Sequence, residues 1–145
     1  MTEAPTRNNE AAVVKAWGWT QQPGCIPLSR KVFRKWLAKN GAALFEENAS
    51  LCFSELMSNA IRIPSPSGLT ETRWLLYADK LRVEVQDFSS EAPYLSFVGE
   101  DSESGRGLLL VHVLADKWGY DHTSFLHPYG EGYMPGKTVW FEIER

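Results

Sequence analysis

The sequence predicts an α+β fold, a two-layer sandwich in which a mixed, mainly antiparallel sheet carries helices on one face. Two amphipathic helical segments follow each other directly, one from Leu28 and one from Phe45. The strand-like segments after them come as two hairpins, and strands joined by hairpins are antiparallel. These two observations favour a sandwich over a doubly wound parallel sheet, in which strands and helices alternate.

Length and composition limit the class of protein. At 145 residues the chain can form one domain with a sizeable core. The segment Met1–Ala11 is polar, lacks the apolar stretch of a signal peptide and is expected to be disordered, which leaves 12–145 as the domain. The net charge of −3 gives no reason to expect nucleic acid or an anionic membrane as partner. No apolar run is long enough to span a bilayer, and a cytoplasmic protein is expected. Cys25 and Cys52 lack C-x-x-C spacing and are interpreted as packing residues in a reducing compartment.

The first third of the chain predicts a strand followed by a helix. Ala12–Gln21 is typical of a strand, and Pro23-Gly24 marks a turn. The next helix is predicted from Leu28, with Ser29 as its cap and Asn40-Gly41 as its end. Its apolar stripe consists of Val32, Phe33, Trp36 and Leu37, and its basic face of Arg30, Lys31, Arg34, Lys35 and Lys39. That face is either solvated or a surface for an acidic partner, and solvation is favoured.

A second helix is predicted over Phe45–Ile63, which contains good helix formers and stops before Pro64. Glu55 and Asn59 are four residues apart and therefore stack one turn above the other at the rim of its apolar face. They are either an ordinary half-exposed pair or a pair that activates water and holds a hard cation. That apolar face consists of Cys52, Phe53, Leu56, Met57, Ala60 and Ile63.

The remainder predicts two hairpins separated by a long connection. Thr70–Tyr77 and Leu81–Phe88 are strands joined at Ala78-Asp79-Lys80, with Asp87 at the end of the second. Ser89–Ser104 is polar and unusually long for a loop inside a domain, which indicates a functional or mobile segment.

The second hairpin comes after a short helix. Gly105-Arg106-Gly107 is predicted as a turn that leads into this helix at Leu108. Lys117–Leu126 and Thr138–Ile143 are the last strands, with a long turn over 127–136. Glycines before a helix let backbone N–H groups approach an anion such as phosphate, although G-x-G alone is a weak signal.

Four segments together resemble the sequence boxes of the GHKL ATPases, the Bergerat-fold superfamily that includes gyrase, histidine kinases and mismatch-repair proteins. SELMSNAI resembles the N box and LRVEVQDFSSEAP resembles the box after it, while ESGRGLLLVHVLADKWGY and GKTVWFEI resemble the next two. The match runs from about Val32 to Glu144 and is most similar to the small branch of anti-sigma factor serine/threonine kinases. The order and separation of four boxes are specific, although each box alone is not.

The resemblance implies ATP and Mg²⁺ as cofactors. Glu55 matches the general base that would polarise an attacking hydroxyl. Asn59 matches the residue whose side-chain oxygen holds Mg²⁺. Asp87 matches the carboxylate that accepts a hydrogen bond from the adenine amino group, and Thr138 matches the hydroxyl that supports this contact.

The resemblance also implies a phosphate-binding turn and a lid. Gly105, Arg106, Gly107 and Leu108 match the turn whose amides meet the phosphates, and Ser89–Ser104 would be the ATP lid. Two departures concern these boxes: Phe88, Ser89 and Ser90 follow the aspartate where relatives have glycines, and the lid is acidic. Ile63-Pro64 stands where relatives have His-Gly.

Two functions stay open. The first is an anti-sigma factor that binds a sigma factor and phosphorylates its antagonist, a protein of the STAS type. The second is a catalytically weak or inactive module that keeps the fold and regulates a partner by partner switching. Tyr129 and Tyr133 are candidate partner-contact residues, and a homodimer is possible. The three histidines, His112, His122 and His127, lack a plausible ligand set, so no metal site other than nucleotide-bound Mg²⁺ is expected.

Overall fold

The computed structural model describes residues 10–89, 91–93, 103–127, 130 and 132–145. Met1 to Asn9, most of the segment expected to be disordered, lie outside the described residues. Within the described part, no helix is long and apolar enough to cross a membrane. The elements in chain order are β1 (Val13–Thr20), α1 (Cys25–Lys39), the short 3₁₀ helix η2 (Ala43–Phe45), α2 (Glu46–Ala60), β2 (Leu69–Leu76), β3 (Lys80–Asp87), α3 (Glu103–Leu114), β4 (Lys117–Leu126) and β5 (Tyr133–Glu144).

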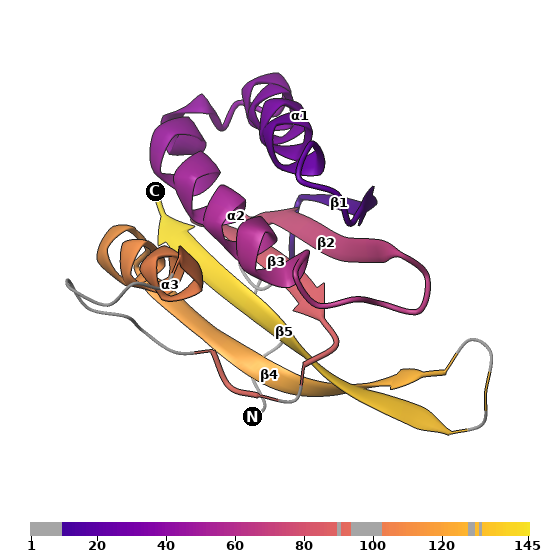
Figure 1. Cartoon of the computed structure of the whole chain (residues 1–145). Coiled ribbons are helices and arrows are strands. Elements are labelled where there is room, and N and C mark those ends of the chain that lie inside the picture. Colours follow the sequence, from indigo (N-terminus) through magenta and orange to yellow (C-terminus); the bar gives the residue numbers. More distant parts are fainter. Residues whose placement is uncertain (1–9, 90, 94–102, 128–129, 131) are drawn as a thin grey trace, which may run out of the picture.

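The five strands form one sheet in the order β1-β2-β3-β5-β4. Each neighbouring pair is antiparallel. Figure 1 shows α1, α2 and α3 on the same face of this sheet. The predicted α+β sandwich is therefore confirmed, and all four pairings in this sheet are antiparallel.

The core lies between the sheet and the helices. Side chains on a strand alternate between its two faces, so every second residue of β3 and β5 points toward the helices. On β3 these are Leu81, Val83, Val85 and Asp87, and all four are buried. Trp74 of β2 is fully buried, with the Phe33 ring centroid of α1 at 4.9 Å and the Phe53 ring centroid of α2 at 5.5 Å. This aromatic cluster fixes α1 and α2 to the sheet.

Helix α1 begins at Cys25, three residues before the predicted start at Leu28. Pro27 therefore lies in the first turn, where its missing N–H removes no helical hydrogen bond. Ser29 does not cap the helix: it is fully buried, and its hydroxyl donates to the Ile26 carbonyl at 3.1 Å. The predicted end is correct, because Gly41 follows with a positive φ of 70°.

Helix α2 confirms the apolar face of the second predicted helix. Cys52, Phe53, Leu56, Met57 and Ala60 are all buried. The helix is shorter than predicted, since η2 occupies its first residues and α2 ends at Ala60. Pro64 disfavours helix at the residues just before it.

Strand β5 starts at Tyr133, five residues before the predicted start at Thr138, so the turn before it is shorter than expected. It continues the ladder with β4 as far as the pair Leu126–Tyr133. Gly136 permits this: a Cβ there would lie 2.6 Å from the carbonyl oxygen of Asp87 and would overlap the Phe125 ring. Tyr133 is exposed, and Tyr129 lies outside the described residues.

Helix α3 begins at Glu103, so Gly105, Arg106 and Gly107 belong to its first turns and not to a preceding turn. The helix packs against α2. Most of the predicted lid, residues 90 and 94–102, lies outside the described residues.

Candidate functional site

A pocket lies where α2 and α3 meet the ends of β3 and β5. Its cavity volume is about 230 Å³. This is below the roughly 300–1,000 Å³ typical of pockets that enclose a drug-sized ligand, so this cavity matches one ring system of a larger ligand. The lining residues are Leu56, Asn59, Ala60, Arg62, Ile63, Val85, Asp87, Ser89, Glu91, Ala92, Pro93, Leu108, Lys137 and Val139.

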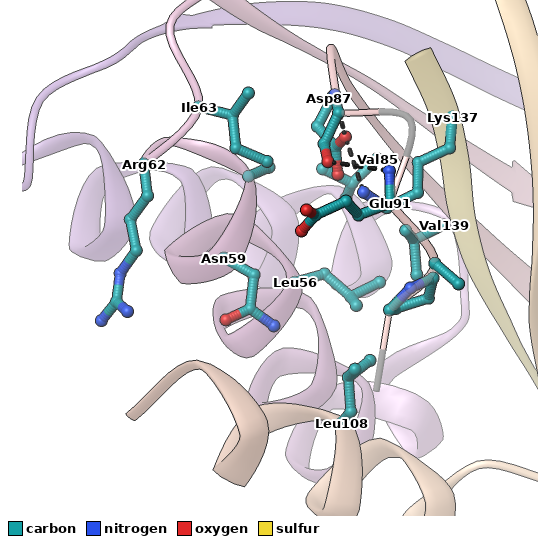
Figure 2. Close-up of a pocket in the computed structure, with 14 residues that line it drawn as sticks. Leu56, Asn59, Arg62, Ile63, Val85, Asp87, Glu91, Leu108, Lys137 and Val139 are labelled. Carbon is teal, nitrogen blue, oxygen red and sulfur yellow. Dashed lines mark hydrogen bonds and ion pairs between the residues drawn. The ribbon is translucent and has the colours of Figure 1, made fainter. Parts of the chain in front are cut away.

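Most of the wall is apolar. Leu56, Ala60 and Ile63 come from α2 and the turn after it, and Val85 and Val139 come from neighbouring strands. Figure 2 shows Leu108 of α3 on the side of the pocket away from Asp87. A planar apolar ring is the ligand group that such facing aliphatic side chains bind.

Asp87 and Lys137 form a buried ion pair at one end of the pocket (Figure 2). Lys137 Nζ donates to Asp87 Oδ1 at 2.9 Å, and each side chain is 6% exposed. The two residues are direct partners in the β3–β5 ladder, which brings together positions 50 residues apart. The Ser89 backbone N–H donates to the same oxygen at 2.9 Å. Both of these hydrogen bonds use Oδ1, so with respect to the described residues Oδ2 keeps its capacity to accept from a ligand.

Asn59 supplies an unsatisfied oxygen on the helix side of the pocket. Its Oδ1 atom is buried and has no hydrogen-bond partner among the described residues. Figure 2 shows the Asn59 carboxamide between α2 and α3. Because a buried polar atom without a partner costs free energy, this oxygen is suited to a ligand or a cation that completes its bonding.

The chain after Asp87 forms one rim of the pocket. The Glu91 backbone N–H donates to the Ser89 hydroxyl at 3.1 Å, and Ala92 and Pro93 follow along the lining. Figure 2 shows the Glu91 carboxylate pointing into the pocket. These residues are the first part of the predicted lid, so the described part of that segment borders the pocket.

Glu55 lies one helical turn before Asn59 and is half-buried, but it does not line the pocket. Its carboxylate instead affects the pKa of the neighbouring Cys52. Burial raises the pKa of the Cys52 thiol to about 12, and the Glu55 charge adds to this effect. The sequence expectation that Glu55 and Asn59 lie at the rim of the apolar face is confirmed, whereas the role of Glu55 as a base stays a prediction.

Thr138 lies on the opposite face of β5 from the pocket. Its neighbours Lys137 and Val139 line the pocket, and side chains alternate along a strand. The Thr138 hydroxyl lies 3.5 Å from that of Thr123 on β4. The structure therefore does not bring Thr138 to Asp87, and Lys137 takes the place beside the carboxylate.

Leu108 is 3% exposed, and its side chain lines the pocket. Gly105 and Arg106 lie in the first turn of α3, whose backbone N–H groups have no partner within the helix, and Gly107 follows that turn. Their predicted contact with phosphates stays a prediction.

Lys137 is the main site residue that the sequence analysis missed. The alternation of the last strand could have found it, since Lys137, Val139, Phe141 and Ile143 share one face and the last three are apolar. Arg62 and Glu91 were missed because a turn and a loop have no periodicity from which direction can be read.

A cation in this pocket would depend on few protein ligands. Among the described residues, no group of three or more His, Cys, Asp or Glu side chains could hold a metal ion. The unpartnered Oδ1 of Asn59 fits Mg²⁺, which prefers oxygen ligands and is bound with one or two protein groups plus substrate phosphates.

Two comparisons with known proteins complete the description of the site. The sequence profile of the histidine kinase-like ATPase domain matches residues 20–127, about three quarters of the chain. A search of curated protein sequences gave no significant match. The matched segment contains Glu55, Asn59, Asp87 and Leu108, and it ends before Lys137.

Proposed function

The chain belongs to the histidine kinase-like ATPase domain family, and from this premise we propose that its pocket binds ATP together with Mg²⁺. One observation carries the proposal: two oxygen atoms that accept no hydrogen bond from the described residues, Asn59 Oδ1 and Asp87 Oδ2, belong to the lining of one largely apolar pocket. A nucleobase needs apolar walls and one hydrogen-bonding group, and a nucleotide-bound cation needs an oxygen ligand.

Different residues of the pocket contact the base, the cation and the phosphates of the nucleotide. The base lies between the aliphatic side chains of α2 and those of β3 and β5, and its exocyclic amino group donates to Asp87 Oδ2. Asn59 Oδ1 is the protein ligand of Mg²⁺, which neutralises charge on the phosphates. The phosphates extend toward the first turn of α3, where free backbone N–H groups and the positive helix end favour an anion.

The activity that we propose is phosphate transfer to a serine or threonine hydroxyl. Glu55 accepts the proton of the attacking hydroxyl, and the γ-phosphoryl group passes from ATP to that oxygen. By resemblance to the small GHKL kinases, the acceptor is an anti-sigma-factor antagonist of the STAS type and the second partner is a sigma factor, both in the cytoplasm. Transfer requires little covalent chemistry from the protein and depends on positioning.

A second candidate is a nucleotide-binding module without turnover, which regulates its partner by binding alone. The observation that favours it is the position of Glu55, which does not line the pocket. In this case binding of ATP would change the affinity for the partner, but no phosphate would be transferred.

Binding of ATP in the presence of Mg²⁺, measured by isothermal titration calorimetry, tests the site. Asn59→Ala and Asp87→Ala should each weaken binding by roughly tenfold or more, since each removes a bond to a charged group. Asn48→Ala on the exposed face of α2 and Asp121→Ala on β4 are matched controls and should leave the affinity unchanged. A wild-type protein that binds no adenine nucleotide would overturn the proposed function.

Transfer of labelled γ-phosphate to an antagonist of the STAS type distinguishes the two candidates. Glu55→Gln should keep ATP affinity and lower the transfer rate by roughly 100-fold or more, as expected for loss of a general base. Transfer that survives this substitution would remove Glu55 from its role. Bound ATP without any transfer by the wild type would support the binding module.

A further inference from the structure

The ion pair of Asp87 and Lys137 leaves bonding capacity unused inside the pocket. A lysine ammonium has three N–H donors. Among the described residues, the hydrogen bond to Asp87 Oδ1 is the single one that Lys137 makes. The Lys137 side chain is 6% exposed and lines the pocket, so little water reaches its remaining donors. Charged groups that leave water require partners, and a ligand in the pocket can supply them.

We propose that Lys137 is a specificity-determining residue that reads the purine base together with Asp87 and extends recognition from adenine to 6-oxopurine nucleotides. This inference rests on the proposed nucleotide site. It concerns the position of the base where adenine carries an amino group and guanine or hypoxanthine carries a carbonyl oxygen.

A carboxylate alone selects adenine because it can only accept hydrogen bonds. It accepts from the adenine amino group, which is a donor, and it repels the O6 carbonyl of a 6-oxopurine, which is an acceptor. The ammonium of Lys137, 2.9 Å from Asp87 Oδ1, removes this repulsion because it donates to O6. Asp87 Oδ2 then accepts from the adjacent ring N1–H, which 6-oxopurines have and adenine lacks.

Adenine finds a matching arrangement when the base shifts in its own plane, so that position 6 faces Asp87 and N1 faces Lys137. Its amino group donates to Asp87 Oδ2, and its ring nitrogen N1 accepts from Lys137. The pair therefore presents one donor and one acceptor to either base. Position supports the same conclusion, since Asp87 and Lys137 are fixed by direct pairing of β3 with β5 and both line the pocket.

Affinities for ATP, ITP and GTP in the presence of Mg²⁺ test the inference, with the same calorimetric measurement. ITP differs from ATP only at the purine 6-position and N1, so this pair isolates the contact, and GTP adds the 2-amino group. The wild type should bind ITP within about tenfold of ATP. Lys137→Met should weaken ITP binding by roughly tenfold or more and ATP binding by less, because O6 then faces a carboxylate without a donor.

Two further variants make the result specific. Lys80→Met removes another ion-paired strand lysine, bound to Glu142 at 3.2 Å and outside the pocket, and should leave the ITP-to-ATP ratio unchanged. Lys137→Gln keeps an N–H donor beside Asp87 and should retain part of the ITP affinity. Circular dichroism of each variant shows whether it is folded.

The possible outcomes separate this inference from the function on which it rests. Wild type that binds ATP at least 100-fold more tightly than ITP would overturn the role of Lys137 and leave the ATP site in place. Wild type that binds none of the three nucleotides would overturn both. A folded Lys137→Met variant with an unchanged ITP-to-ATP ratio would also remove Lys137 from base recognition, whatever the wild-type ratio is.

Discussion

At the scale of single residues, Cys52 shows how burial in the core changes the pKa of a side chain beside the site. The residue is fully buried in α2, one turn before Leu56 of the pocket wall. Burial disfavours the thiolate, and the negative charge of Glu55 disfavours it further, so the pKa of Cys52 rises to about 12. Burial also raises the pKa of Cys25, which is 4% exposed.

Both thiols should therefore be unreactive in the folded protein, because the thiolate is the nucleophile and neither sulfur is accessible. Ellman's reagent at pH 8 should label neither cysteine on the time scale of minutes. The same protein in guanidinium chloride is the control and should release two equivalents of product. Rapid labelling of the native protein would show that α2 opens locally.

At the scale of elements, the junction of β3, β5 and β4 places the polar end of the pocket. Gly136 lies at a close contact between these strands: an added Cβ would be 2.6 Å from the Asp87 carbonyl oxygen, against the Phe125 ring. The next residue is Lys137, which binds Asp87. A side chain at position 136 would therefore push β5 away from β3 next to the ion pair.

Gly136→Ala should lower the free energy of unfolding by about 1–3 kcal/mol, the usual cost of overpacking a close contact. It should also weaken nucleotide binding, since it separates Asp87 from Lys137. Gly24→Ala is the matched control: no atom lies within 4 Å of its added Cβ, and its φ of −63° suits alanine. That control should be neutral or more stable by up to about 1 kcal/mol in urea unfolding. Equal stability of the two variants would contradict the steric role of Gly136.

At the scale of the whole molecule, an ionic network covers the sheet face opposite the helices and links β3 to β5. Glu142 accepts one hydrogen bond from Arg82 at 3.0 Å and pairs with Lys80 at 3.2 Å, and its side chain is 9% exposed. Burial alone would raise the pKa of Glu142, but the hydrogen bonds and charges of Arg82 and Lys80 outweigh it and lower the pKa. Arg82 also lies over the Trp140 ring at 4.2 Å.

This network should make stability dependent on pH in the acid range. Because the folded-state pKa of Glu142 is below its unfolded value of about 4.3, its contribution is complete above that value and is lost as pH falls through the folded-state pKa. Glu142→Gln should destabilise the protein at pH 7, and the difference from wild type should shrink toward pH 3. Glu144→Gln, exposed on the same strand, is the control. A difference that stays constant from pH 7 to pH 3 in urea unfolding would show that the charge of Glu142 does not act in this way.

Local patterns predicted the elements whose signals are periodic. The alternation of Leu81, Val83 and Val85 identified β3, and the apolar face of the second helix was correct residue by residue except at Ile63, which is half-buried. The predicted starts of α1 and β5 were wrong, because a proline or a glycine that looked like part of a turn lies inside the helix or the strand. Pro27 is tolerated in the first turn of α1. Gly136 continues strand β5 at a position where the Phe125 ring leaves no room for a side chain.

Part of the pocket lining coincides with residues that the resemblance to the GHKL boxes named. Asn59, Asp87 and Leu108, which the resemblance assigned to a nucleotide site, line the pocket. Thr138 was placed by resemblance, and the alternation of its strand directs it to the other face of the sheet. Glu55 is near Asn59 along the helix but does not line the pocket.

By itself, the sequence determined the fold class, the antiparallel hairpins and the helix that carries Glu55 and Asn59, because these depend on periodicity and on neighbours in the chain. Only the tertiary structure decided which charged side chains form an ion pair. The ladder between β3 and β5 pairs Asp87 with Lys137, 50 residues apart, and buries both. Such a contact depends on strand order and register, which are set by packing of the whole sheet against its helices, and it is this contact that gives the pocket a donor beside its acceptor.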